Sequence, residues 1–412
     1  MGMNDTPSGE RVHIGFFGVR NAGKSSLVNA VTGQSLAVVS NVAGTTTDPV
    51  RKAMELLPVG PVLIVDTPGL DDEGELGSLR VEKALRALDS TDVAVLVVDS
   101  GKGMGCIDEE LVESFRKRNV PYVIAWNKCD LPYKGFETAE DASVDSGADS
   151  RSIQVKTSAT QGIGIEALKD AIATLAASAR DERKLVSDLV EPCDVLVLVV
   201  PIDSAAPKGR IILPQQQVIR DCIEAQALAF ITSVETLPAL LESLTKPPKL
   251  VITDSQAFGS VSALVPDEVP LTSFSILMSR YKGTLNAQIQ AVNSLEELGD
   301  DDNVLISEGC THHRQCGDIG TVKLPAFIRG ICGKNPTFSF TSGGEFPSDL
   351  GAYSLVVHCG GCMLNEREMR HRLTVAENQG VPFTNYGMAI AKANGVFERS
   401  LEPLKAIMQN RW

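Results

Sequence analysis

The sequence contains few aromatic residues and few histidines, and it lacks long apolar runs. Aromatic side chains make up 5% of its 412 residues, and histidine occurs only 5 times. No apolar run approaches the roughly 18 residues that a membrane-spanning helix requires. The opening residues, MGMNDTPSGE, are polar and lack the apolar stretch of a secretory signal. We therefore expect a cytoplasmic protein with no membrane partner.

Basic residues are scarce relative to acidic ones. The sequence has 38 Lys and Arg against 52 Asp and Glu, which gives a formal net charge of -14 and a pI near 4.9. Because nucleic-acid backbones bind basic surfaces, this balance disfavours broad nucleic-acid binding. The 9 cysteines are an odd number in a chain without a secretion signal. Clustered cysteines in a reducing compartment indicate metal or redox chemistry rather than disulfides.

The first part of the chain alternates apolar strands with amphipathic helices. Near-continuous apolar runs at 12–17, 62–65, 93–98 and 120–126 are separated by helical patterns. Such strands are typical of a parallel sheet covered by helices on both faces. We therefore expect an α/β domain over residues 1–180.

Two further α/β blocks follow. The second block, 181–268, is short and has no glycine-rich phosphate loop. Its small sheet would expose apolar surface, which favours self-association, so we expect a homodimer through this middle domain. The third block, 269–412, contains a helical pattern over 284–298, short strands and the clustered cysteines.

The segment GVRNAGKS (18–25) follows an apolar strand and opens a helix. It satisfies the pattern G-x-x-x-x-G-K-[ST], in which backbone N–H groups and the helix N-terminus bind phosphate oxygens. Lys24 would reach the β- and γ-phosphates, and Ser25 would ligate Mg²⁺. The match in this strand–loop–helix context predicts a P-loop nucleotide site.

Two segments of the same domain fit the phosphate-sensing parts of a GTPase. In DTPG (66–69), Asp66 would hold a water on Mg²⁺, and the Gly69 N–H would sense the γ-phosphate. The segment AGTTTD (43–48) lies between the phosphate loop and DTPG and supplies a switch threonine.

Two later segments fit the base-binding parts. In NKCD (127–130), Asp130 would accept hydrogen bonds from guanine N1–H and from its exocyclic amine. Adenine lacks that amine, so it would leave the carboxylate unpaired. The segment TSA (157–159) fits the loop that closes over the base. We therefore expect GTP rather than ATP.

This part of the chain resembles the bacterial translation-factor-like GTPases that modify tRNA or assist ribosome assembly. In that group AGTTTD matches a G-T-T-R-D segment, which implies that Thr46 binds Mg²⁺. Leu70 follows DTPG and cannot orient water as the glutamine of Ras-type enzymes does. The resemblance instead implies that Asn21 binds K⁺, which supplies the positive charge of an arginine finger. No general base can be assigned among the acidic residues after Leu70.

The resemblance also implies the roles of the site residues. The expected catalytic residues are Lys24, Thr46 and Gly69, and Ser25 and Thr46 would hold Mg²⁺. Hydrolysis should be slow without K⁺. The expected GTP-binding residues are Gly18, Asn21, Ala22, Gly23, Lys24, Ser25, Ser26, Thr46, Asp66, Gly69, Asn127, Lys128, Asp130, Ser158 and Ala159.

Cysteines and histidines gather in two segments of the third block. CTHH (310–313) follows the apolar run VLIS, and HCGGC (358–362) follows SLVV. The Cys-x-x-Cys spacing brings two thiolates within reach of one metal, and the paired glycines let the backbone wrap closely around it. The first segment supplies a third thiolate. The candidate ligands are Cys310, Cys359 and Cys362.

The spacing alone leaves the metal open. Zinc would want a fourth ligand, for which His312 or His358 could serve. A 4Fe-4S cluster held by three cysteines would leave one iron open or weakly ligated. A redox dithiol and coincidental buried cysteines are further readings, although the dithiol does not explain the third cysteine. We interpret Cys316 and Cys332 as structural.

The combination of motifs resembles the HydF family, the maturation GTPases of FeFe-hydrogenases. The signature of that family is Cys-x-His, a long gap and then His-Cys-x-x-Cys. Here CTH (310–312) precedes HCGGC (358–362). The resemblance covers the whole chain and implies a GTPase domain, a small α/β dimerisation domain and an α/β cluster domain. It also implies a 4Fe-4S cluster rather than zinc.

The HydF resemblance implies a scaffold or carrier. Such a protein would assemble or hold a di-iron precursor bearing CO and cyanide and deliver it to apo FeFe-hydrogenase, with radical-SAM maturases as upstream partners. GTP would gate these associations through the switch loops. Two alternatives are a ribosome- or tRNA-associated GTPase with a zinc-binding C-terminal module, which the acidic pI disfavours, and a GTP-regulated electron-transfer protein.

Overall fold

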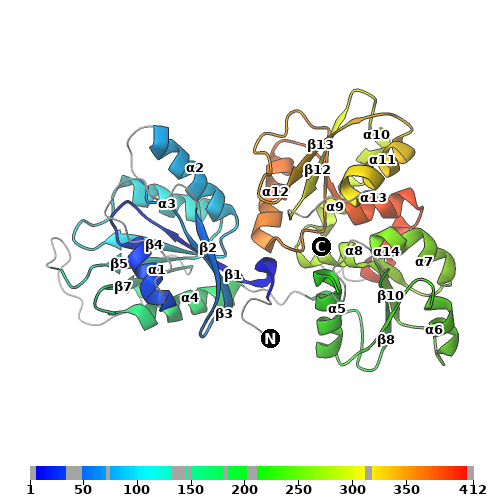
Figure 1. Cartoon of the computed structure of the whole chain (residues 1–412), viewed down its shortest axis with the longest axis horizontal. Coiled ribbons are helices and arrows are strands. Elements are labelled where there is room, and N and C mark those ends of the chain that lie inside the picture. The colour runs from blue at the N-terminus through cyan, green and yellow to red at the C-terminus, as the bar shows by residue number, and fades with distance from the viewer. Residues whose placement is uncertain are drawn as a thin grey trace. The chain divides into compact units, whose positions relative to one another are not determined.

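The computed structural model describes residues 6–33, 49–70, 75–131, 145–146, 151–179, 184–201, 211–310 and 318–405. The chain divides into two compact units, Met1–Glu182 and Arg183–Trp412 (Figure 1). The predictions at Thr46, His312, His313 and Cys316 lie outside the described residues, as do the first acidic residues after Leu70.

The described part of the first unit contains a seven-stranded sheet in the order β2-β3-β1-β4-β5-β7-β6. The strands from β3 to β7 in this order run parallel, whereas β2 and β6 pair antiparallel at the two edges. The strands are β1 (Val12–Phe17), β2 (Val50–Leu56), β3 (Gly60–Asp66), β4 (Val93–Asp99), β5 (Tyr122–Asn127), β6 (Asp145–Ser146) and β7 (Ser152–Lys156).

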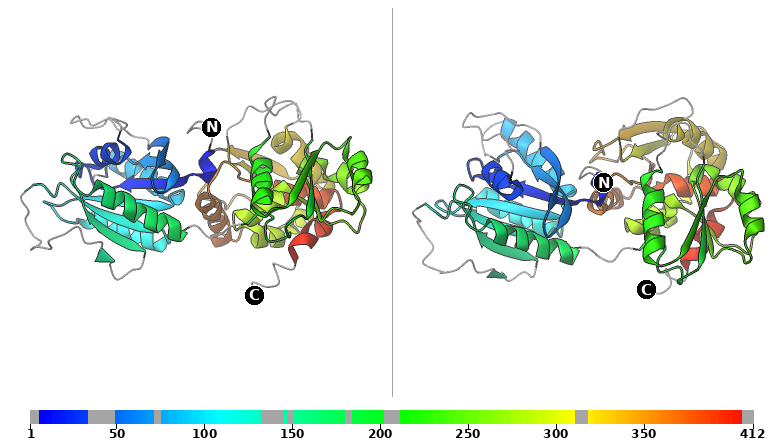
Figure 2. Two further views of the ribbon diagram at one scale, coloured as in Figure 1. Left: turned by 90° about the horizontal axis from the view of Figure 1, so that it is seen from below. Right: turned by 60° about the horizontal axis from the view of Figure 1, so that its bottom comes forward.

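Helices cover both faces of this sheet (Figure 2). They are α1 (Lys24–Thr32), α2 (Glu75–Asp89), α3 (Cys106–Lys117) and α4 (Ile165–Ala179), and the 3₁₀ turn η1 (Ser8–Glu10) precedes β1. One core contains side chains of α1 and α4, and the other contains side chains of α2 and α3. The whole of β4 is buried between them. The predicted P-loop domain with a parallel sheet is therefore confirmed.

The second unit contains, in its described part, two four-stranded parallel sheets. Their strand orders are β11-β10-β8-β9 and β13-β12-β14-β15. β11 belongs to the first of these sheets although it lies beyond residue 268, where the sequence predicts the end of the middle domain. The strands are β8 (Val195–Val199), β9 (Leu228–Thr232), β10 (Leu250–Thr253), β11 (Leu271–Ser273), β12 (Asn303–Glu308), β13 (Thr337–Ser342), β14 (Leu355–His358) and β15 (Phe383–Asn385).

Short helices connect these strands. The pattern predicted over 284–298 forms two helices, α9 and α10, instead of one. The helices are α5 (Leu213–Glu224), α6 (Leu237–Ser243), α7 (Phe258–Leu264), α8 (Phe274–Tyr281), α9 (Leu285–Ala291), α10 (Ser294–Glu297), α11 (Leu324–Cys332), α12 (Glu366–Asn378), α13 (Tyr386–Ala393) and α14 (Phe397–Leu401), with shorter turns η2 (Ser255–Ala257), η3 (Ile319–Lys323) and η4 (Glu402–Leu404).

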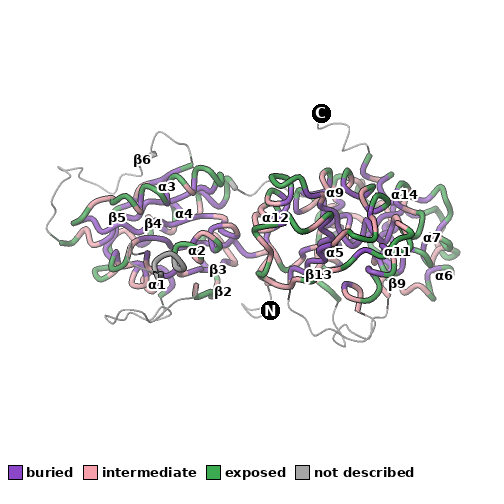
Figure 3. The backbone as a smooth tube through the Cα atoms, turned by 90° about the horizontal axis from the view of Figure 1, so that it is seen from above, coloured by how far each residue is buried: buried purple, intermediate pink, exposed green. Residues whose placement is uncertain are grey.

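Two apolar cores hold the second unit together. The larger core joins the two sheets and includes Leu355 and Val357 of β14. The smaller core includes Val356 of β14 together with apolar residues of α12. Successive strand residues point to opposite faces, so β14 divides its side chains between the two cores. The inner strands β8, β10, β12 and β14 are buried along almost their whole length, whereas the edge strands β9 and β13 are exposed or half-buried; Figure 3 colours the backbone by this burial. Among the described residues, no helix is long and apolar enough to cross a bilayer.

Candidate functional site

The phosphate loop joins the end of β1 to the start of α1. Gly23 precedes α1 with a φ of 90°, in the left-handed region that favours glycine. A Cβ atom at Gly23 would lie 2.2 Å from Asn127 Nδ2, so a larger residue would displace Asn127 of the NKCD segment (127–130), which is expected to bind the base. This close packing keeps the loop around the N-terminus of α1, the arrangement that binds phosphate.

The first turn of α1 lies beside the aspartate that ends β3. Lys24 is 8% exposed, and Ser25 Oγ donates a hydrogen bond to Asp66 Oδ2 at 3.0 Å. Burial lowers the pKa of Lys24, although the Asp66 charge opposes this. Burial also raises the pKa of Asp66, against the Lys24 charge and the Ser25 hydrogen bond. Asp66 Oδ1 is buried and makes no hydrogen bond to the described residues, which fits a water held on Mg²⁺. Ser26 follows, half-buried, on α1.

The DTPG segment lies against the phosphate loop through its last residues. Leu70 N donates to Gly18 O at 3.3 Å, and Arg20 N donates to Leu70 O at 3.0 Å. A Cβ atom at Gly69 would lie 3.1 Å from Arg20 Cα. The Leu70 side chain is 2% exposed and lies in the core with α2 and α3. Its burial agrees with the expectation that it does not orient water.

Asn127 joins three loops of the nucleotide site. Its Nδ2 donates to Ala22 O at 3.0 Å, and its Oδ1 accepts from Ala159 N at 3.2 Å. Ser158 is buried, and its N–H donates to Ile163 O at 3.0 Å. The phosphate loop, the NKCD segment and the TSA segment are thus tied together around one side chain.

Lys128 links the base loop to Asn21. Its Nζ donates to Asn21 O at 2.7 Å and to Asp99 Oδ2 at 2.7 Å. Asn21 is exposed and has a φ of 64°, and Asp130 is exposed beside Lys128. The sequence analysis missed Asp99, although an aspartate that ends a buried parallel strand was a usable signal.

The three candidate cysteines follow two strands that pair directly. Cys310 follows β12, and the HCGGC segment follows β14. These strands are parallel neighbours, with Ser307 opposite His358, and Cys359 N donates to Ser307 O at 2.9 Å. Since the carboxyl ends of parallel strands meet at one edge of a sheet, the topology brings the two cysteine segments together.

Backbone amides surround the Cys359 thiol. Gly309 N donates to Cys359 Sγ at 3.0 Å, and Gly361 N donates to it at 3.4 Å. Gly361 has a φ of 61°, and a Cβ atom there would lie 2.4 Å from Met369 Sδ. The glycine is therefore required for the backbone to turn around the thiol.

The three thiols influence one another electrostatically. Burial raises the pKa of Cys310 to about 11, with smaller contributions from Cys362 and Glu308. Burial raises the pKa of Cys359 to about 12, against the two amide hydrogen bonds and with Cys362 and Cys310 raising it further. The described His, Cys, Asp and Glu side chains nevertheless form no ready group of three around one point. The three candidate cysteines are neighbours, and their side chains would have to move closer together to hold a metal.

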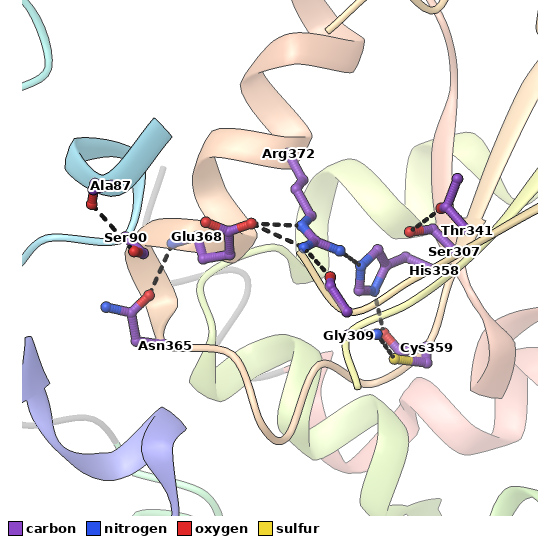
Figure 4. Close-up of polar contacts among 11 residues, drawn as sticks. Ala87, Ser90, Ser307, Gly309, Thr341, His358, Cys359, Asn365, Glu368 and Arg372 are labelled. Carbon is purple, nitrogen blue, oxygen red and sulfur yellow. Dashed lines mark hydrogen bonds and ion pairs between the residues drawn. The ribbon is translucent and has the colours of Figure 1, made fainter. Parts of the chain in front are cut away.

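His358 has hydrogen-bond partners at both ring nitrogens (Figure 4). Nδ1 lies 2.7 Å from Cys359 O, and Nε2 lies 3.0 Å from Arg372 Nη1. The side chain is fully buried. Burial lowers the pKa of His358 to about 3, and the Arg372 charge contributes in the same direction.

Glu308 and Tyr386 adjoin the thiols and were missed by the sequence analysis. Glu308 ends β12, is 5% exposed, and accepts a hydrogen bond from the Tyr386 hydroxyl at 3.4 Å. Burial raises the pKa of Tyr386, and the charges of Cys359 and Glu308 raise it further. The available signal was an acidic residue at the end of a buried strand.

Cys332 ends α11, and a short turn separates it from the start of β13 at Thr337. β13 runs parallel to β12, so α11 ends at the edge of the sheet opposite the cysteine segments. Its thiol lies 3.6 Å from Lys334 O. This position agrees with a structural interpretation of Cys332.

Comparisons with known families and proteins cover most of the chain. The family model of the hydrogen maturase F dimerization domain matches residues 185–283, and that of the hydrogen maturase F tetramerization domain matches residues 286–403. The model of the 50S ribosome-binding GTPase matches residues 13–128. The region predicted to hold the cluster is thus matched as an oligomerisation domain.

Curated relatives match only part of the chain. The tRNA modification GTPase MnmE of Laribacter hongkongensis is 34% identical over 164 residues, which cover 40% of this chain and 34% of the relative. The GTPase Der of Wolinella succinogenes is 34% identical over 141 residues, which cover 34% of this chain and 29% of the relative. The chain therefore spans about a third of the length of these relatives.

Similar solved structures are also GTPases or GTP-binding proteins. Era in complex with MgGDPNP and 16S ribosomal RNA has a TM-score of 0.34 and 19% identity, covering 54% of this chain and 91% of that one. NFeoB from S. thermophilus bound to GDP.AlF4- and K+ has a TM-score of 0.32 and 23% identity, covering 42% of this chain and 64% of that one.

The two hydrogen maturase F models together match more than half of the chain, and the GTPase model matches the unit with the phosphate loop. The protein is accordingly a GTPase that binds GTP and Mg²⁺ and carries two oligomerisation domains. It belongs to the HydF family.

Proposed function

We propose that this protein is a GTP-regulated scaffold or carrier that holds a 4Fe-4S cluster. At the cluster site it would assemble or receive a di-iron precursor and deliver it to apo FeFe-hydrogenase, with radical-SAM maturases acting upstream. The proposal keeps three domains, 1–180, 181–268 and 269–412, for GTP hydrolysis, dimerisation and cluster binding.

The neighbouring cysteine segments at one sheet edge carry this proposal. Two strands bring Cys310 beside the HCGGC segment, and charges on Cys310 and Cys362 help to raise the pKa of Cys359. Amide hydrogen bonds to Cys359 Sγ would stabilise thiolate charge, as around other iron–sulfur centres. When bound, a 4Fe-4S cluster with three cysteine ligands offers one iron to an exchangeable ligand.

Three side chains are candidates for that exchangeable ligand. His312 and His358 come from the family signature, although the ring nitrogens of His358 already have partners. Glu308 is a further candidate, because its carboxylate lies close enough to Cys310 to raise the pKa of that thiol. A labile oxygen ligand would suit a site that must accept cargo.

Asn21 is the proposed K⁺ ligand of the GTPase site. It is exposed and has a φ of 64°, and Lys128 holds its carbonyl group. The side chain is therefore presented from a fixed backbone beside the phosphate loop. With Leu70 buried, a cation is the simplest remaining source of transition-state charge.

The edge strand β9 is the proposed contact of the homodimer. β9 ends the sheet order β11-β10-β8-β9, and three of its apolar residues are exposed: Leu228 by 49%, Phe230 by 40% and Ile231 by 50%. An exposed apolar edge strand is a template for pairing with another chain. Pairing through β9 would join two small sheets and bury this surface.

Anaerobic reconstitution with iron and sulfide tests the scaffold proposal. The wild-type protein should bind about four iron atoms per chain and give the absorption and EPR signals of a reduced 4Fe-4S cluster. A Cys332→Ser control should do the same. Zinc binding without any iron–sulfur signal would instead favour the ribosome- or tRNA-associated alternative.

Delivery is tested separately, with apo FeFe-hydrogenase as the acceptor. Protein loaded by the radical-SAM maturases should activate the acceptor after gel filtration, and unloaded protein should not. Equal activation by loaded and unloaded protein would overturn the carrier role while leaving the cluster site intact.

A further inference from the structure

In the sheet β13-β12-β14-β15, the side chain of His358 lies on one face, and the side chains of Cys359 and Cys362 lie on the other. Strand alternation directs His358 to the same face as Val356, into the smaller core beneath α12. There its ring stacks on Phe383 at 5.7 Å between centroids and adjoins Phe346. Cys359 and Cys362 instead pack against the larger core. The imidazole therefore points away from the thiols.

The hydrogen bonds of His358 assign one tautomer. A backbone carbonyl can only accept, so the contact of 2.7 Å to Cys359 O requires a hydrogen on Nδ1. A guanidinium can only donate, so the contact of 3.0 Å from Arg372 Nη1 requires a lone pair on Nε2. Both requirements are met by the neutral ring, and neither nitrogen is left for a metal.

Arg372 is itself held in place. It is 1% exposed, and its Nε and Nη2 each lie 2.9 Å from Glu368 Oε1. Its Nη2 also donates to Gly343 O at 2.7 Å, and its guanidinium lies over the ring of Phe346. A buried charge is costly unless it is paired and hydrogen-bonded, so these contacts compensate the buried charge of Arg372 and fix the position of its guanidinium.

Cys359 is fixed at three atoms by its neighbours. Its N–H donates to Ser307 O, its Sγ accepts from Gly309 N, and its carbonyl accepts from His358. The first two bonds come from the neighbouring strand and its loop. The third comes from the side chain of the preceding residue and is the one that a side-chain substitution can remove.

We propose that His358 is a positioning residue and not an iron ligand: Arg372 orients its ring, and the ring holds the Cys359 carbonyl so that the thiolate is presented to the cluster. The inference rests on the proposed function, since it assumes that Cys359 is a ligand. It removes His358 from the candidates for the fourth ligand of the cluster.

The first test uses the full-length, metal-free protein. The rate at which iodoacetamide alkylates Cys359, followed by mass spectrometry, reports how firmly this residue is held. His358→Phe keeps an aromatic ring without nitrogens, and Arg372→Met removes the orienting donor. Both should speed alkylation at Cys359 about fivefold, the effect of losing one hydrogen bond.

Conservative and matched variants separate positioning from general damage. His358→Asn keeps an N–H near the position of Nδ1, so its alkylation rate should stay within about twofold of wild type. The matched control His371→Asn, on α12 beside Arg372, should also stay within about twofold. Cys222 lies on α5 and is fully buried, so its alkylation reports unfolding of the whole protein. No acceleration at Cys359, or equal acceleration at Cys222, would overturn the positioning role.

The second test uses the reconstituted full-length protein and pulsed EPR. His358→Asn should leave the iron content and every histidine-nitrogen coupling of the reduced cluster unchanged, whether or not another histidine is bound. Disappearance of such a coupling in His358→Asn alone would identify His358 as a ligand and overturn the inference. If wild-type protein holds no cluster, the proposed function fails, whereas the alkylation rates still decide the role of His358.

Discussion

Single side chains join segments of the nucleotide site that are far apart in the sequence. Asn127 bonds to the phosphate loop through Ala22, and Lys128 bonds to Asn21 and Asp99. The local motifs could be predicted because each needs only a short pattern of residues. Asp99 was missed, although it ends a buried parallel strand, because its partner Lys128 follows a different strand and no short pattern joins the two residues.

The same reasoning applies to the thiolate site. The cysteines could be predicted from their spacing and from the family signature, and the structure brings their segments to one sheet edge. Arg372 could not be predicted, since the sequence does not say which face of its helix it occupies. Glu308 was missed, although an acidic residue at the end of a buried strand was a signal. Their partners, His358 and Tyr386, come from different elements.

The raised pKa of Asp66 predicts an acid limit to Mg²⁺ binding. Burial keeps this carboxyl protonated to a higher pH than an ordinary aspartate, whose pKa is 3.8. Because Mg²⁺ and its water need the carboxylate, Mg²⁺ affinity should fall as pH falls through the raised pKa. Titrations of GTP hydrolysis with Mg²⁺ across the acid range will measure this limit.

Asp66→Asn is the matched variant for this limit. It should lower Mg²⁺-dependent GTP turnover at least about tenfold and abolish the fall in Mg²⁺ affinity at acid pH. In the metal-free protein the raised pKa favours folding only below that pKa, and this contribution is lost as pH rises through it. Urea unfolding at neutral pH should therefore find Asp66→Asn no less stable than wild type. If Mg²⁺ affinity still fell in the same way at acid pH in the variant, Asp66 would not be the group responsible.

If Asn21 binds K⁺, the rate of GTP hydrolysis should depend on which monovalent cation is present. Wild-type protein should hydrolyse GTP at least about tenfold faster in K⁺ than in Na⁺ at equal ionic strength, because the bound cation stabilises charge on the transferring phosphate. Asn21→Ala should lose this stimulation. Asn119→Ala, which also replaces an asparagine of positive φ, should keep it. Equal turnover of wild type in the two cations would refute the role of Asn21.

Among the elements, buried parallel strands were the most predictable. β1 and β4 lie under helices on both faces, so they read as continuous apolar runs and match the predicted 12–17 and 93–98 closely. β2 is an antiparallel edge strand whose residues are mostly exposed or half-buried, so no apolar run marks it. β15 has only three residues and is defined by its pairing with β14.

The exposed strand β9 predicts how the middle domain associates. Ile231→Asp introduces a charge on the apolar edge and should shift the protein to a smaller oligomer, because a buried unpaired charge disfavours strand pairing. Light scattering after gel filtration measures the mass. Leu264→Asp, at the end of α7, is the control and should leave the mass unchanged. An unaltered oligomer in Ile231→Asp would show that β9 is not the contact.

At the scale of the whole molecule, one chain combines a GTPase with two small α/β modules of the hydrogen maturase F family. The family models confirm a GTPase domain followed by two modules of this family, and cluster binding by the last module stays a prediction. Oligomerisation through the last module could not be predicted, because the sequence analysis weighed its cysteines and not its surface. The same module would therefore both bind the cluster and contact other copies of the chain.

The most direct measurement of the central claim uses the triple variant Cys310→Ser, Cys359→Ser and Cys362→Ser. Iron content and the EPR spectrum are recorded after anaerobic reconstitution, beside the rate of GTP hydrolysis. The variant should lose the 4Fe-4S signal and at least about nine-tenths of its iron, since serine is a poor ligand for iron–sulfur clusters, while GTP is hydrolysed at the wild-type rate. A variant that retained the wild-type cluster signal would contradict the assignment of these three cysteines.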